Sequence, residues 1–315
     1  MNIDLSSATL SRKITNFSGR VFGILRISLL LFFLFALLVR VGAQQKASNK
    51  IKLPEELREV SGLYIESPDR FWWHNDSSNP PILFQTDAQG NIREEICLDT
   101  WKNKDWEDIT ADDSGNIYIG DFGNNCNCRT DLRIYIYNQE TEALATIEFT
   151  LEDQTLFPPD KKDQRFDLEA FFWHDGTLHL FSKNTLHGGD WVSTHYVLSE
   201  SPGTQVAQVY ESIVLPKRVV TGAAISADGK TVALVAYRFK MLLGFIPFSQ
   251  ASVFVFSEFE GSNYFQGNMK KKAIPPFFIA TQYESIDFLD AQTVYVASER
   301  TLFIRPRAKK MKILP

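Results

Sequence analysis

A short sequence unit recurs along most of the chain and restricts the fold more than any other feature. The unit is a short strand that begins with an acidic or small residue, a polar turn that contains Asp, and a second strand that ends on polar residues. One copy runs from Asp105-Trp-Glu-Asp-Ile-Thr through Asp112-Asp-Ser-Gly to Asn116-Ile-Tyr-Ile-Gly-Asp. Other copies begin near Ser61, Glu169, Gly222 and Glu284, so the spacing is roughly 50–60 residues. A unit with such a period is typical of repeat arrays and β-propellers.

Each unit is predicted to contain four strands. From Ile51 onward, segments rich in β-branched and aromatic residues alternate with turns of Asp, Gly, Asn and Pro, and we find no amphipathic helix of three turns or more. In the second unit we expect strands at 107–112, 116–121, 132–138 and 145–151. The last unit offers only three, at 284–288, 293–298 and 301–306. The Lys-rich segment 307–315 is expected to be a solvated terminus, and 239–251 a loop-like insertion.

The segment Asn49–Leu53 is expected to supply the missing strand of the last unit. A ring of sheets that stayed open would leave an unpaired strand edge, which proteins avoid. We therefore predict an all-β fold, a β-propeller of five four-stranded blades that is closed by an N-terminal strand, with six blades as the alternative.

Residues 1–43 are predicted to be a signal peptide or an N-terminal anchor helix, and residues 44–315 a single propeller domain. Basic residues precede the unbroken apolar run Ile27–Val39, which is shorter than the roughly 20 residues of a bilayer span. Small residues follow at Val41-Gly-Ala, which favours cleavage near Ala43, whereas Arg40 fits an uncleaved anchor better. Either alternative predicts an extracytoplasmic protein, whether secreted, periplasmic or envelope-associated, that contacts the membrane only through an uncleaved leader.

The charge of the chain disfavours nucleic acid as a partner. The first 43 residues carry five Lys or Arg and one Asp, so their removal would change the net charge from −5 to −9. Binding to a phosphate backbone relies on basic patches, which an acidic domain lacks. Cations and neutral ligands suit it better.

The three cysteines do not form a metal-binding pattern. Cys97 is isolated, Cys126 and Cys128 are two residues apart, and no CxxC pair is present. In an oxidising compartment one bridge would join Cys97 to Cys126 or to Cys128, and free surface thiols are the alternative.

Polar residues are expected to gather at one mouth of the central channel. The first strand of each blade lines the channel and the second is antiparallel to it, so the start of the first and the end of the second lie at the same mouth. The residues predicted to bind a ligand there are Glu59, His74, Glu107, Asp108, Glu169, Lys183, Arg238 and Glu284, with Trp191 in a nearby loop as a stacking surface.

Three roles for these residues stay open. Glu107, Glu169 and Glu284 would repel one another, so a bound Ca²⁺ would stabilise them, since this ion prefers carboxylate and amide oxygens. Lys183 and Arg238 would neutralise them instead in an internal salt-bridge network. In the third alternative the carboxylates are catalytic, because clustering raises their pKa values. No Gly-x-Ser-x-Gly elbow, phosphate loop or dinucleotide fingerprint is present, and no catalytic residue is assigned.

Several phrases of the chain resemble a group of largely uncharacterised secreted bacterial β-propeller proteins, and more distantly the gluconolactonase/paraoxonase and esterase-like phytase propellers. The phrases are Glu59-Val-Ser-Gly-Leu, Asp105-Trp-Glu-Asp-Ile, Ile119-Gly-Asp-Phe-Gly-Asn-Asn, Asp167-Leu-Glu-Ala, Leu180-Phe-Ser-Lys-Asn and Thr221-Gly-Ala-Ala-Ile-Ser. The resemblance covers nearly all of 53–306 and implies a calcium ion held in the channel by a Glu and by Asn or Asp residues. Glu59 or Glu107 would match the Glu, and Asn75, Asp121 or Asn124 the other ligands.

The sequence therefore predicts an extracytoplasmic propeller that binds a small-molecule or protein ligand at an acidic channel mouth, with Glu107, Glu169, Asp121, Asn124 and Asn75 as the candidate Ca²⁺ ligands. A metal-dependent hydrolase of lactones, esters or phosphoesters that uses the same rim is the first alternative. A non-catalytic envelope scaffold is the second.

Overall fold

The computed structural model describes residues 49–183, 191–242, 246–275, 281–301 and 304–314. The chain divides into two compact units, Met1–Lys46 and Ala47–Pro315, and everything below concerns the second. The predicted leader 1–43 lies outside the described residues. Among those that are described, no helix combines the length and the hydropathy needed to cross a bilayer.

The described part of the chain is all-β, with three four-stranded sheets and one eight-stranded sheet. The first sheet contains β2 (Val60–Ser67), β3 (Arg70–Asn75), β4 (Ile82–Thr86) and β5 (Ile92–Cys97). The eight-stranded sheet contains two successive runs, namely β6 (Trp106–Ala111), β7 (Asn116–Asp121), β8 (Leu132–Asn138) and β9 (Leu144–Leu151), then β10 (Asp167–His174), β11 (Thr177–Lys183), β12 (Val192–Ser199) and β13 (Gly203–Val214). Its two runs are joined by the parallel pairing of β13 with β9.

The next sheet contains β14 (Val219–Ile225), β15 (Thr231–Leu242), β16 (Ile246–Ser257) and β17 (Asn268–Ala273). The last contains β18 (Tyr283–Asp290), β19 (Thr293–Ser298), β20 (Arg307–Lys312) and β1 (Lys50–Lys52). Three short 3-10 helices, η1 (Glu55–Leu57), η2 (Lys161–Asp163) and η3 (Tyr264–Gln266), lie in connections.

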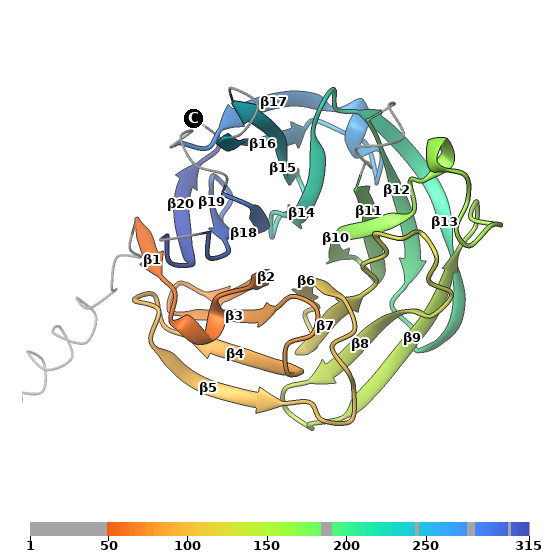
Figure 1. The fold of residues 1–315 in the computed structure, drawn as a ribbon. Coiled ribbons are helices and arrows are strands. Elements are labelled where there is room, and N and C mark those ends of the chain that lie inside the picture. The colour runs from red at the N-terminus through yellow and green to blue at the C-terminus, as the bar shows by residue number, and fades with distance from the viewer. Residues whose placement is uncertain (1–48, 184–190, 243–245, 276–280, 302–303, 315) are drawn as a thin grey trace, which may run out of the picture. The chain divides into compact units, whose positions relative to one another are not determined.

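The first strands of the successive four-stranded runs face a common centre, which is the arrangement of a β-propeller (Figure 1). These inner strands contact one another in a closed series, β2 to β6, β6 to β10, β10 to β14, β14 to β18, and β18 back to β2. Side chains bridge neighbours in the series: Trp173 N donates to Thr110 Oγ1 over 3.1 Å, and Ile65 N donates to Asp287 Oδ2 over 2.6 Å. The predicted propeller architecture is therefore confirmed.

The predicted closure by the N-terminal segment is confirmed. β1 pairs with β20 in antiparallel register, with Ile51 opposite Ala308, and it is the outermost strand of the last sheet. Ile51 and Ala308 are both buried, because the pairing places them against the core of the first sheet.

Three expectations about the C-terminal half are wrong. The third strand of the last sheet is not 301–306, where Thr301 and Ile304 form an isolated bridge and 302–303 lie outside the described residues. The Lys-rich segment is not a solvated terminus, since it forms β20, which lies between β1 and β19. In β20, Lys residues flank the apolar residues Ala308 and Met311, which pack against core clusters. The high local charge obscured this strand pattern in the sequence. The segment 239–251 is not a separate insertion either, because the antiparallel pairing of β15 with β16 continues to Leu242 opposite Ile246.

Turn chemistry explains why the inner hairpins close so tightly. Between β6 and β7, Asp112 Oδ1 accepts the backbone N–H groups of Ser114 and Asn116 over 2.8 and 2.9 Å. Gly115 has φ +79°, a left-handed conformation that costs glycine least. An Asp side chain that bonds to its own turn and a Gly at the positive-φ position together specify the reversal.

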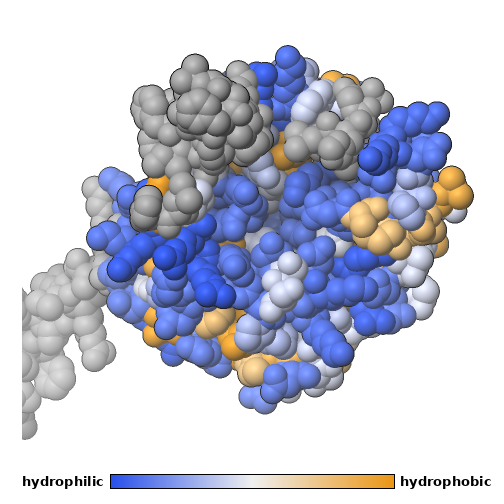
Figure 2. Space-filling view, viewed as in Figure 1, coloured by the Kyte–Doolittle hydropathy of each residue, from blue (hydrophilic) through white to orange (hydrophobic). Residues whose placement is uncertain are grey.

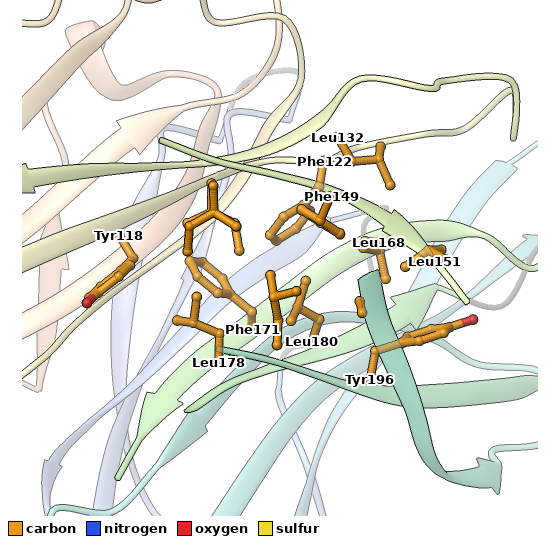
Figure 3. Packing of buried hydrophobic residues seen from close by; sticks show 14 of the residues in the cluster. Tyr118, Phe122, Leu132, Phe149, Leu151, Leu168, Phe171, Leu178, Leu180 and Tyr196 are labelled. Atoms are coloured by element: carbon orange, nitrogen blue, oxygen red, sulfur yellow. The ribbon is translucent and has the colours of Figure 1, made fainter. Parts of the chain in front are cut away.

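The core lies between facing sheet surfaces. Figure 3 shows one part of it, in which side chains of the two runs of the eight-stranded sheet point toward one another. Phe122 and Phe171 pack edge to face with ring centroids 5.2 Å apart, and both are fully buried. Strand alternation directs these side chains inward.

The disulfide differs from the expected pairing. Cys126 is bonded to Cys128, and Cys97 is a free, exposed cysteine. The predicted bridge from Cys97 is therefore wrong, because Cys97 ends β5, an outer strand, whereas the other two lie in the loop after β7.

Candidate functional site

Three carboxylates converge at the channel mouth where the second strand of the first sheet ends and the inner strand of the next four-stranded run begins. Asp76 follows β3, Asp105 precedes β6, and Glu107 lies in β6. One oxygen from each side chain lies within 4.8 Å of the others, and Glu107 is buried while the other two are half-buried. In the part of the chain that is described, no Lys or Arg lies within ion-pair distance of any of the three. We call Asp76, Asp105 and Glu107 the acidic triad.

Asn103 connects the two loops that carry the triad. Its Nδ2 donates to the carbonyl oxygens of Asn75 and Asp76 over 3.0 and 2.8 Å, and its Oδ1 accepts Trp106 N over 3.1 Å. Asn103 is nearly fully buried, so these bonds are shielded from water. The loop after β3 is thereby fastened to the start of β6, which brings Asp76 close to Asp105.

The loop after β7 supports the triad from the other side. Asp121 Oδ1 accepts Asp105 N over 3.1 Å and also pairs with Arg129 Nη2 over 3.1 Å. Arg129 Nη1 donates to the carbonyl oxygen of Gly123 over 2.9 Å. The buried Arg129 therefore neutralises Asp121 and holds the loop against the triad.

Gly123 is a close-approach position next to the triad. A Cβ built on this residue would overlap Glu107 Oε1 and Asp105 Oδ2, so the two carboxylates lie directly against its backbone. Any larger residue would displace these oxygens, because they are the nearest atoms to the added carbon.

A second group of acids surrounds one lysine beside the triad. Lys183, at the end of β11, forms an ion pair with Glu169 of β10, and both side chains are mostly buried. Asp167 lies opposite Lys183 in the strand register and is also buried. Its Oδ1 accepts Asn124 N over 2.7 Å.

Burial and mutual repulsion raise the pKa values of these acids. Burial is the largest cause for each of the residues named here. It raises the pKa of Asp105 to about 6, with the charges of Asp76 and Glu169 adding to the effect. The pKa of Glu107 is raised well above its usual value, and that of Glu169 to about 8, although the charge of Lys183 opposes both shifts. The site therefore contains more acidic side chains than Lys183 can neutralise, and burial favours their protonated forms.

Glu284 and Glu299 extend the acidic surface toward β18 and β19. Gln282 Nε2 donates to Glu284 Oε1 over 2.9 Å and also to Glu299 Oε1. Burial raises the pKa of Glu299 to about 7, and the charge of Asp76 adds to this shift.

The structure brings together Glu107, Glu169 and Lys183, and the charge of Glu169 also raises the pKa of the buried Glu284. Glu59 lies closer to the surface, where its Oε2 accepts Asn79 Nδ2 over 2.6 Å. Arg238, half-buried in β15, forms no ion pair with a described carboxylate, in contrast to the expectation that it would neutralise the acids. Trp191 is half-buried before β12, and its carbonyl oxygen accepts Leu215 N.

Two predicted ligand-binding residues are sealed inside the protein. His74 is fully buried, its ring packs edge-on against Trp106, and burial lowers its pKa to about 4. The fully buried Asp108 accepts Phe171 N over 3.1 Å and Ala223 N over 3.5 Å, so its carboxylate connects three inner strands. Direct contact of either side chain with a ligand would require local rearrangement.

The predicted amide ligands are engaged in loop hydrogen bonds. Asn75 Nδ2 donates to the carbonyl oxygen of Glu56 over 2.7 Å, and its Oδ1 accepts Glu59 N over 3.3 Å. Asn124 Oδ1 accepts Arg129 N over 2.9 Å. These contacts hold the loops that carry the triad, and metal ligation by Asn75 and Asn124 stays a prediction.

The sequence interpretation missed two members of the triad, Asp76 and Asp105. Both lie just beyond strand ends at the predicted mouth, and Asp105 is two residues before Glu107. Residues two apart on a strand share a face, which was the available signal.

The face of the domain in Figure 2 is largely hydrophilic around its centre, with hydrophobic residues in small groups nearer the edge.

Comparisons with known proteins match only at the level of the fold. No family model and no curated protein matches the chain. Solved structures similar to it include the β-propeller domain of Swd1 from Myceliophteria thermophila, with 8% identity, a TM-score of 0.43, and coverage of 84% of this chain and 98% of that chain. A protein assigned as a gluconolactonase shows 12% identity and a TM-score of 0.41, with coverage of 77% of this chain and 70% of that chain. The Dos1 propeller shows 6% identity and a TM-score of 0.38, with coverage of 76% of this chain and 52% of that chain.

Proposed function

We propose that the protein is an extracytoplasmic propeller of five four-stranded blades that binds a small-molecule or protein ligand through Ca²⁺ at its acidic mouth. The blade number is supported if the eight-stranded sheet is counted as two blades, β6–β9 and β10–β13. The Cys126–Cys128 bridge supports an oxidising compartment, as does the apolar leader.

The observation that carries the proposal is the acidic triad itself. Asp76, Asp105 and Glu107 offer three oxygens within 4.8 Å of one another, with no described basic side chain at ion-pair distance. Burial raises the pKa values of all three, and repulsion from neighbouring carboxylates adds to the shifts of Asp105 and Glu107, so it is costly to keep the three ionised together. A divalent cation would remove that cost.

The donor set fits a hard cation. All three groups are carboxylates, and Ca²⁺ takes six to eight oxygen ligands in flexible geometry. Asp76, Asp105 and Glu107 would hold the ion and leave coordination positions open toward the mouth. An oxygen-bearing ligand or a partner carboxylate would occupy those positions, so the ion would link protein and ligand.

Calcium titration of wild type and of Gly123→Ala tests the proposal without changing any charge. The Ala methyl group would displace the oxygens of Glu107 and Asp105, and the backbone need not move because only side-chain ends are in the way. We expect calorimetry at pH 8 to show Ca²⁺ binding to wild type and affinity at least about tenfold weaker for the variant. Without Ca²⁺, the free energy of unfolding should differ by less than about 1 kcal/mol.

The matched control is Asp160→Asn, which removes an exposed carboxylate outside the site and should bind Ca²⁺ like wild type. Folded-state binding should also stabilise wild type by about 2.7 kcal/mol at a free Ca²⁺ concentration of 100 times Kd. Absence of binding and of stabilisation at millimolar Ca²⁺ would remove the ion from the proposal.

A hydrolase is the second candidate, and the pKa values favour it. Asp105 and Glu299 have pKa values raised to about 6 and about 7, the range in which a carboxyl group both donates and accepts protons near neutrality. A panel of lactones, esters and phosphoesters tests this candidate with the double variant Asp105→Asn, Glu299→Gln, which changes the two residues whose pKa values favour it. Hydrolysis by wild type that the double variant retains in full would exclude the acidic mouth as its active site.

A further inference from the structure

Basic side chains are concentrated on the outer strands of the last two sheets. The strands β1, β17 and β20 contain two, three and four Lys or Arg residues, and they contain no Asp or Glu. They lie at the periphery of the domain, since β17 and β1 end their sheets and β20 pairs with β1 (Figure 1). The chain as a whole has a net charge of −5, so this local excess of basic residues runs against its overall balance.

The strand register of the last sheet directs four of these side chains toward the sheet that contains β17. Lys309 lies opposite Val296, which belongs to the apolar cluster between the last two sheets. Residues that lie opposite one another in an antiparallel pair share a face, as do residues two apart on one strand. Arg307 therefore shares the face of Lys309, and so do Lys50 and Lys52, which lie opposite Lys309 and Arg307.

The strand β17 directs two lysines toward the last sheet in return. Lys270 lies opposite Val255 and Lys272 lies opposite Val253. Both valines belong to the same apolar cluster between the two sheets. Lys270 and Lys272 therefore share the face that packs against the last sheet.

Two hydrogen bonds cross from one sheet to the other at this place. Lys272 Nζ donates to the carbonyl oxygen of Lys312 over 3.1 Å, and Lys309 Nζ donates to the carbonyl oxygen of Pro275 over 2.8 Å. Basic side chains of two sheets are thereby brought together. We call six of them the basic band, namely Lys50, Lys52, Lys270, Lys272, Arg307 and Lys309.

The charges of the basic band repel one another. In the part of the chain that the structure describes, no Asp or Glu forms an ion pair with Lys52, Lys270 or Lys309. Burial lowers the pKa of Lys309, and the charges of Arg307 and Lys50 lower it further. An anion from outside the domain would relieve this repulsion.

The position of the band favours an extended anionic surface over a small enclosed anion. Lys50, Lys52 and Lys270 are exposed. They belong to the outermost strands of two neighbouring sheets, so they are spread along the outside of the domain. Several lysines spread in this way can each contact a separate phosphate of a membrane surface.

The sequence before β1 argues for a bilayer as that surface. Residues 40–49 separate the apolar run Ile27–Val39 from Lys50, and ten residues span at most about 33–36 Å when fully extended. An uncleaved leader would therefore keep the band close to the membrane that it enters. Basic residues next to a membrane anchor are attracted to anionic lipid headgroups, and each contributes about fivefold to the binding constant.

We propose that the basic band docks the propeller domain on an anionic phospholipid surface, with the uncleaved leader as the second attachment. The ammonium and guanidinium groups would pair with the phosphate groups of the lipids. The short linker raises the local concentration of the band at the bilayer, so the two attachments reinforce each other. This contact is additional to the one expected through the leader, and it does not use the acidic triad.

Amine labelling of the full-length protein in vesicles tests the proposal. The protein is reconstituted into vesicles of phosphatidylcholine and into vesicles that also contain phosphatidylglycerol, and labelling of each Lys is read by mass spectrometry. We expect Lys50, Lys52 and Lys270 to be labelled at least about fivefold more slowly in the anionic vesicles. Added NaCl should remove this protection, because the attraction is between charges. Lys161 and Lys162 of η2, which are exposed, should be labelled equally in both.

A double variant locates the contact. Lys52→Gln with Lys270→Gln removes two exposed charges from the band and should weaken docking by about 30-fold, so that Lys50 is labelled at the same rate in both kinds of vesicle. The matched control Lys161→Gln with Lys162→Gln removes two exposed charges from η2 and should retain the protection of the band.

Three results would overturn the proposal. The first is equal labelling of the wild-type band in the two kinds of vesicle, and the second is protection that the double variant of the band retains in full. The third is the same protection by inorganic phosphate in phosphatidylcholine vesicles, which would assign the band to a small anion.

Discussion

Replacing Lys183 with Met is expected to destabilise the protein strongly and in a pH-dependent way. Lys183 forms an ion pair with Glu169, and their side chains are 19% and 4% exposed. Removing one partner of a buried pair leaves an uncompensated charge and costs about 3–5 kcal/mol. Lys183 also opposes the raised pKa values of Glu107, Asp167 and Glu284, so several carboxylates lose their counter-charge at once.

The sign of the pH dependence follows from Glu169. Its folded-state pKa of about 8 is above the unfolded value, so its ionisation destabilises the folded protein as pH rises through 8. Without Lys183 that pKa would rise further, and the penalty at high pH would grow. From Glu169 alone, the loss should be at most about 0.8 kcal/mol larger at pH 8.5 than at pH 6, because wild-type Glu169 is itself largely neutralised by a proton below its pKa of about 8.

Equilibrium unfolding in urea, followed by tryptophan fluorescence at both pH values, measures this difference. Lys104→Met is the control, because Lys104 is 53% exposed and its ion pair with Asp131 should contribute only about 0–1 kcal/mol. If both variants lost the same free energy, or if the loss for Lys183→Met did not change with pH, the assignment of Lys183 as counter-charge of a buried acidic group would be refuted.

Two further predictions concern the interior. Burial lowers the pKa of His74 to about 4, so as the pH falls below about 6.5 the unfolded chain takes up a proton before the folded protein does, and stability is lost. At pH 5 the loss is about 2 kcal/mol. The variant His74→Gln should therefore show a smaller change in urea midpoint between pH 7 and pH 5 than wild type. Phe171→Ala should cost about 3–5 kcal/mol at pH 7 with an unchanged urea m-value, since the ring is fully buried against Phe122; a loss below about 1 kcal/mol would contradict this packing.

Much of the architecture could be predicted because strand signals are local. Alternation and Asp-Gly turns identified inner hairpins such as β10–β11, and the need to pair a strand edge led to the role of β1. The same rules missed β20, whose Lys residues resemble a solvated tail until β1 and β19 are placed on either side of it.

The candidate site was predictable in part. The convergence of Glu107, Glu169 and Lys183 follows from strand order, since each lies at a strand end of the same mouth. Asp76 and Asp105 could not be ranked, because their positions depend on bonds made by Asn103 and Asp121 within loops.

The sequence by itself determined the repeated strand–turn–strand unit, the acidic balance and the segment able to close the ring, because each depends on neighbouring residues or on composition. Only the tertiary structure decided which carboxylates lie close together, which of them forms an ion pair with Lys183, and which Asn side chains form hydrogen bonds with the loops. Those outcomes depend on contacts between residues far apart in the chain, for example Asp108 with Ala223, whose geometry the local pattern does not encode.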